Sequence, residues 1–204
     1  MAKVVIDMSL SLDGFIAGVH DNEKQPLGEN GSVLHEWLFQ GTAPIRDNDF
    51  FKLSEPSHSV LEASFENTGA ILTGRRTYDI VGGWGGSHPF QGVPVYVMTH
   101  QAPETVPEGT TSFHFVTDGI EQAVVQAKKE AEDKNIGVSG AVVAQQCLEA
   151  GLVDELHLHL VPVLLGGGIR LFKEQKAELE WMKAVEAPGV THLFYRVRKN
   201  RSRA

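Results

Sequence analysis

The chain has 204 residues, of which 42% are hydrophobic and 22% are charged, and this composition is ordinary for a soluble globular domain with a substantial core. Eighteen basic residues against 26 acidic ones give a formal net charge of −8, which argues against a general nucleic-acid binder or an anionic-membrane binder. A single cysteine, Cys147, excludes an intrachain disulfide framework and a cysteine zinc cluster.

The length and the lack of targeting signals favour one cytoplasmic domain. The chain runs from Met1 directly into an apparent strand without a signal-peptide core, and no apolar run approaches the about 20 residues of a bilayer span. We therefore expect a single domain over residues 1–204, with a loop and helix insertion at about residues 19–68.

The N-terminal part begins with a strand. Apolar residues alternate with others over residues 4–12, and Asp13-Gly14 then forms a turn. Residues 20–31 have the polar, glycine-rich composition of a surface loop. Helices are expected over residues 32–39, with Ser32 as the N-cap, and near residues 59–67.

Strands and helices alternate through the rest of the chain. Short apolar runs predict strands over residues 70–73, 93–99, 113–116, 136–138 and 153–164. Helical spacing predicts helices over residues 75–81, 118–134 (with Asp118 and Glu121 as a capping pair) and from Ser139 to Gly151. Residues 178–185 and 190–198 predict a closing hairpin, followed by a basic, solvated tail. The order indicates a mixed α/β sheet.

The turn from Gly137 to Val143 carries the first functional signal. We expect Ser139 to cap the following helix, and Gly140 to let a ligand approach the backbone closely. The unpaired N–H groups at a helix N-terminus and its positive dipole end attract anions. We interpret this turn as the grip on the pyrophosphate of a dinucleotide.

Two further strand ends strengthen that interpretation. Thr73 to Thr77 follows one predicted strand, and Thr99-His100 follows the next. Ligands of open α/β sheets gather outside the carboxyl ends of strands, and the guanidinium groups of Arg75 and Arg76 suit phosphate.

The ordered set of motifs resembles the dihydrofolate-reductase-like superfamily, and most closely its RibD C-terminal branch, the reductase domain of riboflavin biosynthesis. The motifs are Met8 to Ala17, Thr73 to Tyr78, Gly137 to Gly140, Val153 to Gly168, and Pro188 to Arg198. The resemblance implies a mainly parallel sheet with flanking helices and an antiparallel C-terminal hairpin. It also implies a homodimer that binds NADPH and reduces a small heterocyclic, pyrimidine- or pterin-like substrate, similar to 5-amino-6-(5-phosphoribosylamino)uracil reductase.

The same resemblance assigns site residues by position. Gly74, Arg75, Arg76 and Thr77, with Thr73 before them, would contact the cofactor phosphates. Thr99 and His100 would lie near the adenosine 2′-phosphate; Ser139, Gly140, Ala141 and Val142 would hold the pyrophosphate; Ile16 and Ala17 would border the nicotinamide. Asp13 and Trp37 would face the substrate.

The proton donor is less determined. Dihydrofolate reductases use a carboxylate on their first helix, but the alignment on Trp37 leaves Leu34 near its position, so Asp13 or Glu36 is the hypothesis for the catalytic acid. The loop over residues 20–30 is longer than the riboflavin enzyme leads us to expect, which leaves the substrate open. The zinc deaminase half of bifunctional riboflavin proteins needs a Pro-Cys-x-x-Cys pattern that this chain does not have.

Particular residues bear on three other functions: a metal site, a serine hydrolase and a protein without catalytic activity. His157 and His159 could begin a metal site, but no third ligand has suitable spacing, so we expect core or interface histidines and no metal. Ser139 lacks the Gly-x-Ser-x-Gly elbow of a serine hydrolase. A catalytically inactive nucleotide-binding or scaffold protein of the same fold, or a dihydrofolate reductase, remains the alternative to the reductase.

Overall fold

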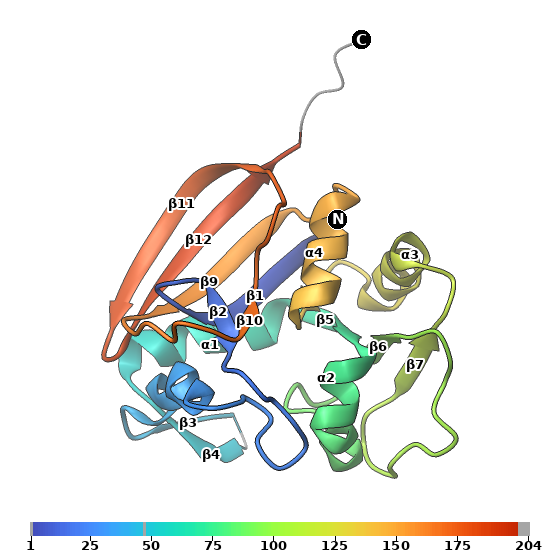
Figure 1. The fold of residues 1–204 in the computed structure, drawn as a ribbon, viewed down its shortest axis with the longest axis horizontal. Coiled ribbons are helices and arrows are strands. Elements are labelled where there is room, and N and C mark those ends of the chain that lie inside the picture. The colour runs from blue at the N-terminus through green and yellow to red at the C-terminus, as the bar shows by residue number, and fades with distance from the viewer. Residues whose placement is uncertain (1, 47, 200–204) are drawn as a thin grey trace.

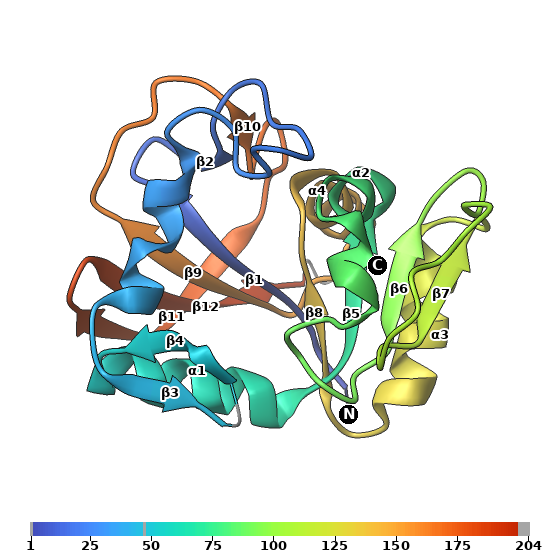
Figure 2. The same ribbon diagram turned by 90° about the horizontal axis from the view of Figure 1, so that it is seen from below.

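A twisted sheet of eight strands runs through the computed structural model, which describes residues 2–46 and 48–199 (Figure 1). The strand order is β11-β12-β9-β1-β8-β5-β6-β7. The bounds are β1 Val4–Ser11, β5 Thr68–Gly74, β6 Val95–Met98, β7 Phe113–Val116, β8 Asn135–Val138, β9 Glu155–Val161, β11 Glu178–Ala187 and β12 Val190–Arg198. The hairpin of β11 and β12 forms one edge of the sheet, and β6 and β7 form the other (Figure 2).

The pairing is parallel from β9 through β1, β8, β5 and β6 to β7, and antiparallel where β12 joins β9 and β11. This is the mixed, mainly parallel sheet with a C-terminal hairpin that the sequence predicts. Because parallel strands share a direction, their carboxyl ends meet at one edge, where the loops can form a common site.

Helices cover both faces of the sheet. The helices are α1 Glu55–Asn67, α2 Arg75–Ile80, α3 Ile120–Ala131 and α4 Ala141–Glu149. The main core joins one face of the central strands, with Ile6, Leu72 and Ile136, to the alanine- and valine-rich sides of α3 and α4. On the opposite face, Ile71 and Val95 contact Tyr78 of α2. None of the helices in the described ranges is long and apolar enough to cross a membrane.

The region predicted as an insertion contains more structure than a loop and a helix. The 3₁₀ helix η1 (Gly31–Phe39) leads into a hairpin of β3 (Ala43–Ile45) and β4 (Asn48–Leu53), which the sequence analysis did not predict, and then into α1. Leu34 and Trp37 of η1 pack with Ile45, Leu53 and Phe65 in a second core cluster. The remaining short elements are β2 Phe15–Ala17, which pairs with β10 Ile169–Arg170, and the 3₁₀ helix η2 Gly82–Gly86.

Two predicted N-caps are wrong. The N-cap of η1 is Asn30 in the left-handed conformation (φ 59°), so Ser32 lies inside the helix. The N-cap of α3 is Gly119 with φ 92°, a backbone conformation that favours glycine, and it displaces Asp118 from the capping position. The predicted basic tail continues beyond Lys199 and so lies mostly outside the described residues.

Leu72 tests the main core, because it is fully buried in the central strand β5. We expect Leu72→Ala to lower the free energy of unfolding by about 2–5 kcal/mol, since it removes apolar contacts and leaves a cavity. Chemical denaturation measures the change. Val125→Ala on α3, where the side chain is 60% exposed, is the matched control and should cost well under about 1 kcal/mol. Equal losses in the two variants would contradict the assignment of the core.

Candidate functional site

A cleft of about 1100 Å³ crosses the carboxyl ends of the central strands. It extends from α1 and η1, over Asp7 and Ser9 of β1, to the start of α2, the end of β6 and the start of α4. Its residues therefore come from segments that are far apart in the chain, and the parallel sheet brings them together.

The turn before α4 differs from its predicted form. The N-cap is Gly140 with φ 88°, and no side chain caps the helix, so the prediction of Ser139 as the cap is wrong. The backbone N–H of Ser139 donates to the carbonyl of Leu72 at 2.9 Å, which ties the turn to the neighbouring strand. A Cβ atom at Gly140 would lie 2.8 Å from the hydroxyl oxygen of Thr77, and the φ of 88° is a backbone conformation that favours glycine.

Two buried hydroxyl groups at this turn are unpaired. Ser139 Oγ and Thr73 Oγ1 are inaccessible to solvent and have no hydrogen-bond partner among the described residues. Buried polar atoms are rarely left without a partner, and the first N–H groups of α4 also lack partners within the helix. The turn therefore offers hydrogen-bond donors to an acceptor such as a phosphate oxygen.

The two arginines flank the same turn, but carboxylates already bind them. Arg75 donates through Nε to both oxygens of Asp79 (2.7 and 2.9 Å) and through Nη1 to the carbonyl of Gln101 at 2.6 Å. Arg76 donates through Nη2 to Asp21 Oδ1 at 2.6 Å, which links α2 to the loop after β2. The sequence analysis did not anticipate these partners, which offset the poor match between a cation and a helix N-terminus.

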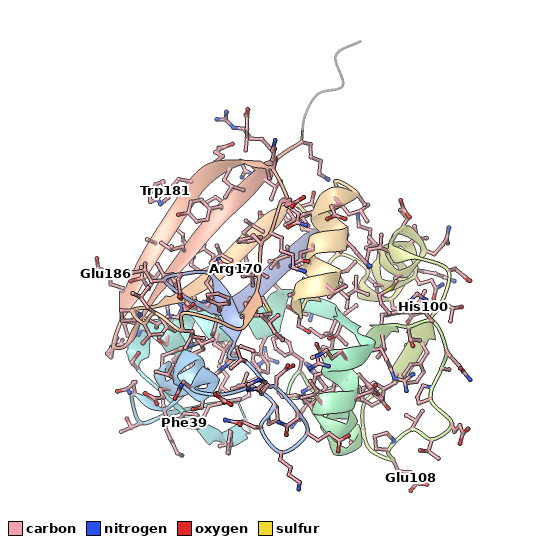
Figure 3. All side chains as sticks on the ribbon, viewed as in Figure 1. Phe39, His100, Glu108, Arg170, Trp181 and Glu186 are labelled. Atoms are coloured by element: carbon pink, nitrogen blue, oxygen red, sulfur yellow. The ribbon has the colours of Figure 1, made fainter. Side chains whose placement is uncertain are left out.

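The end of β6 completes this side of the cleft. Thr99 Oγ1 donates to the carbonyl of Gln101 at 2.7 Å and lies 3.4 Å from Arg75 Nη1. His100 is exposed and points away from the strands (Figure 3). Both residues line the cleft. We call this side, with α2, the end of β6 and the start of α4, the phosphate end.

Most of the residues predicted to hold the cofactor line the cleft. They are Ile16, Ala17, Gly74, Arg75, Arg76, Thr77, Thr99, His100, Ser139, Gly140, Ala141 and Val142. Thr73 is fully buried behind this lining. Trp37, predicted to face the substrate, lines the cleft at its other side.

The two carboxylates predicted as catalytic, Asp13 and Glu36, are not among the residues that line the cleft. Asp13 accepts hydrogen bonds from Ser11 Oγ (2.5 Å) and from the backbone N–H groups of Leu165 (3.1 Å) and Gly166 (2.8 Å). The hydrogen bond from Ser11 is the main cause that lowers the pKa of Asp13 to about 2. Asp13 thus fastens the turn after β1 to a distant loop, while Glu36 is exposed on η1.

A carboxylate that the sequence analysis missed does line the cleft. Asp7 of β1 accepts from His159 Nε2 at 2.8 Å and from Ser64 Oγ at 2.8 Å. His159 Nδ1 lies 2.8 Å from His192 Nδ1, and His192 Nε2 lies 3.1 Å from Ser57 Oγ. A hydrogen-bonded chain thus connects β1, β9, β12 and α1 beneath the cleft.

The charge of Asp7 follows from this network. Burial alone would raise the pKa of Asp7, but the charges of His159 and His157 and the hydrogen bond from His159 outweigh it and hold the pKa well below its usual range. In the sequence, Asp7 stands out only as a charged residue at an alternating position inside a predicted strand. Among the described residues, no group of three or more His, Cys, Asp and Glu side chains has an arrangement that could hold a metal ion.

Trp37 closes the cleft above this network. Its indole Nε1 donates to Ser9 Oγ at 3.0 Å, and its ring centroid lies 5.1 Å from those of both His159 and His192. Leu38, Phe51, Leu61 and Phe65 extend the apolar lining from η1, β4 and α1. We call this side, with Asp7, Trp37 and these apolar residues, the substrate end.

The fold and cleft define a dihydrofolate-reductase-like α/β protein with an open site at the carboxyl ends of its parallel strands. The family model for the RibD C-terminal domain matches residues 2–188, and the chain belongs to this family.

Relatives and solved structures agree with this assignment. The chain is 27% identical over 175 residues to the uncharacterised protein YwjB of Bacillus subtilis, covering 84% of this chain and 83% of YwjB. A putative riboflavin biosynthesis protein from Shewanella sp. PV-4 has a TM-score of 0.70 at 24% identity, covering 97% of this chain and 99% of that one. Dihydrofolate reductase from Enterococcus faecalis, complexed with NADP(H), has a TM-score of 0.58 at 13% identity, covering 97% and 96% of the two chains.

Buried neutral histidines predict how stability depends on pH. Burial lowers the pKa of His35, His88 and His192 from 6.5 to about 4, with the nearby charge of His159 as a second cause for His35 and His192. The unfolded chain therefore binds protons that the folded chain does not. We expect the free energy of unfolding to fall between pH 6.5 and pH 4, by about 1.4 kcal/mol per pH unit for each such histidine.

Denaturant unfolding at a series of pH values measures this slope. His88→Gln should reduce the slope by about one proton, because it removes one of these groups. Gln126→Ala changes an exposed side chain of α3 that carries no titratable group, and it should leave the slope unaltered. An unchanged slope in His88→Gln would show that His88 is not held neutral by the fold.

Proposed function

We propose that this protein is an NADPH-dependent reductase that transfers hydride to a small nitrogen heterocycle. Membership of the RibD C-terminal family and the likeness to dihydrofolate reductase support the reductase class. The observation that carries the proposal is the pair of unpartnered buried hydroxyls, Thr73 Oγ1 and Ser139 Oγ, beside the open N-terminus of α4. They are donors without an acceptor beside the turn that the sequence resemblance assigns to the pyrophosphate.

The residues fit the cofactor by their chemistry. The N–H groups of Ala141 and Val142, with the hydroxyl of Ser139, would hold the pyrophosphate, and Gly140 would leave space for it. Arg75 and Arg76 would bind phosphate oxygens through bidentate hydrogen bonds, with Thr99 and His100 near the 2′-phosphate. Ile16 and Ala17 would border the nicotinamide. When bound, NADPH supplies the hydride.

The protein's own contribution is positioning and exclusion of water. Trp37, Leu38 and Phe65 form apolar walls that hold a flat ring in one orientation and keep solvent away from the reacting atoms. No carboxylate of η1 lies in the cleft: Leu34 is fully buried in the second core cluster, and Glu36 is exposed. The acid of a dihydrofolate reductase therefore has no counterpart on η1, which disfavours a folate reductase as the alternative.

Titration of the protein with NADPH, followed by cofactor fluorescence, tests the proposal. We expect a Kd in the micromolar range or tighter, and we expect Arg75→Ala with Arg76→Ala to weaken NADPH by about 10- to 100-fold, since charge-assisted hydrogen bonds to phosphate are lost. NADH lacks the 2′-phosphate and should lose much less.

Arg196→Ala provides the matched control, because Arg196 is paired with Glu180 on the terminal hairpin, away from the cleft. It should leave both affinities unchanged. Absence of NADPH binding would refute the reductase, and equal losses for NADPH and NADH would refute the phosphate role of the arginines. Binding without oxidation of NADPH by any heterocycle would favour the inactive scaffold.

We also propose a homodimer formed through β11. β11 is the edge strand of the described sheet, so its outer backbone groups are free to pair, and it exposes Leu179 (41%) and Trp181 (65%), the latter visible at the outside of the hairpin (Figure 3). Size-exclusion chromatography with light scattering should give a dimer for the wild type and a monomer for Trp181→Glu. Phe39→Glu removes another exposed aromatic side chain and should remain dimeric; a monomeric wild type would contradict the proposal.

A further inference from the structure

Asp7 is the carboxylate at the substrate end of the cleft, and no lysine or arginine accompanies it there. Along the whole lining, drawn from the described residues, the only lysine or arginine side chains are Arg75 and Arg76 at the phosphate end. The sequence suggested two other carboxylates. Asp13 accepts hydrogen bonds from the backbone N–H groups of Leu165 and Gly166, and Glu36 is exposed to solvent. Asp7 is thus the group that can give this end of the cleft its chemical preference.

The carboxylate of Asp7 keeps unused hydrogen-bonding capacity. A carboxylate has about four acceptor sites, and two are occupied: Oδ1 by His159 Nε2 and Oδ2 by Ser64 Oγ, both at 2.8 Å. His157 Nδ1 is 3.8 Å from Oδ2, which is too far for a hydrogen bond. The side chain is 22% exposed and lines the cleft, so the remaining acceptor sites are available to a ligand.

The orientation of Asp7 is fixed before any ligand binds. His159, which holds Oδ1, is itself held by His192, and His192 by Ser57, and the last two side chains are fully buried. Ser64 holds Oδ2 from the other side, from helix α1. A carboxylate fixed by three elements of the fold loses little freedom when it binds a donor, which favours affinity and specificity.

The walls above Asp7 suit a flat ring. Trp37 lies beside the His159 ring, and Phe65 stacks on Phe90 with centroids 4.0 Å apart, while Leu38 and Leu61 add aliphatic surface. Aromatic rings stack on such walls, whereas a phosphate would meet no lysine or arginine to replace its lost hydration.

We propose that Asp7 is the substrate anchor, and that it selects an unphosphorylated nitrogen heterocycle whose ring presents N–H donors to this carboxylate. The inference deepens the proposed reductase function and rests on it for the reaction, though not for the binding. It separates the chain from a reductase of 5-amino-6-(5-phosphoribosylamino)uracil, because that substrate carries a phosphate.

Binding of two probes that share a ring tests the anchor. 2,4-Diaminopyrimidine presents N–H donors, and 2,4-dimethoxypyrimidine has the same ring without them. By calorimetry in the absence of cofactor, we expect the wild type to bind the diamino probe at least about tenfold more tightly, and Asp7→Asn to lose most of this preference. Asp21→Asn, the same change at the phosphate end, should keep it.

Thermal unfolding identifies any variant that fails to fold. In that case, the difference in affinity of the wild type for the two probes is the test of the anchor. Equal affinity of the wild type for both probes overturns the inference, as does an undiminished preference in a folded Asp7→Asn. These titrations need no NADPH, so a failure of the reductase proposal, seen as absent NADPH binding, is distinguishable from a failure of the anchor.

Exclusion of phosphate is tested on the variant with both Arg75→Ala and Arg76→Ala, which removes the only lysine or arginine side chains of the described cleft lining. Cytidine should bind this variant at least about fivefold more tightly than cytidine 5′-phosphate, since the phosphate would meet no lysine or arginine in the cleft and would face the carboxylate of Asp7. Equal or tighter binding of the phosphorylated probe overturns the selection against phosphate.

Discussion

The parallel register of the three central strands is the constraint on which the site depends. β8 lies between β1 and β5, and Val138 is paired with Ile6 on one side and with Leu72 on the other. The next residue of each strand is therefore held in one row: Asp7, Ser139 and Thr73. A slip of one residue in either pairing would turn these polar side chains to the opposite face of the sheet, where the apolar core lies. The residues that seal the core thus also fix the row of polar groups at its edge.

That row carries an energetic cost which the neighbouring residues offset in different ways. A carboxylate such as Asp7, removed from water, is strongly destabilising unless it is paired, and the chain supplies His159 and Ser64 at hydrogen-bond distance. Ser139 and Thr73 receive no such partners within the protein. Asp7, which has hydrogen-bond partners, and Ser139 and Thr73, whose hydroxyls have none, lie in the same row. Within this row, the lack of partners is therefore confined to the side next to the turn before α4. It marks the side of the row where an external acceptor is missing.

The fold was predictable from the sequence because its signals are local. Alternation identified β1 and β9, and helical spacing identified α3, since each of these elements has one apolar face. The caps were not predictable from the same signals: Gly119 and Gly140 begin their helices through a positive φ, although serine or aspartate stood nearby as the more usual cap. The phosphate end was also local, because its residues follow directly after strands. The substrate end was not local, since strand pairing brings Asp7 to His159 across 152 residues and His159 to His192 across 33 residues.

Asp13 and Glu36 show the same difference between closeness in sequence and position in the fold. Asp13 and Glu36 stood beside motif residues, and proximity in sequence made them candidates. In the structure Asp13 accepts a hydrogen bond from the backbone N–H of Gly166 and holds the turn after β1. The 3₁₀ geometry of η1 directs Trp37 inward, while Glu36 faces solvent. Asp7 lies just outside the motif that begins at Met8. Only the sheet register gives it a position in the cleft.

The charges of the cleft are paired at both ends, and this pairing reconciles a net charge of −8 with a site for an anionic ligand. Asp79 and Asp21 bind Arg75 and Arg76, while histidines bind Asp7. A phosphate group at the phosphate end would compete with Asp79 and Asp21 for guanidinium groups that are already oriented. The affinity for the phosphate would then arise from an exchange of hydrogen-bond partners, and not from unpaired positive charges. Asp21 belongs to the loop after β2, and its loss as a partner of Arg76 would release the link between that loop and α2. Binding of the proposed cofactor at the phosphate end would therefore be coupled, through Arg76, to the segment that borders the middle of the cleft.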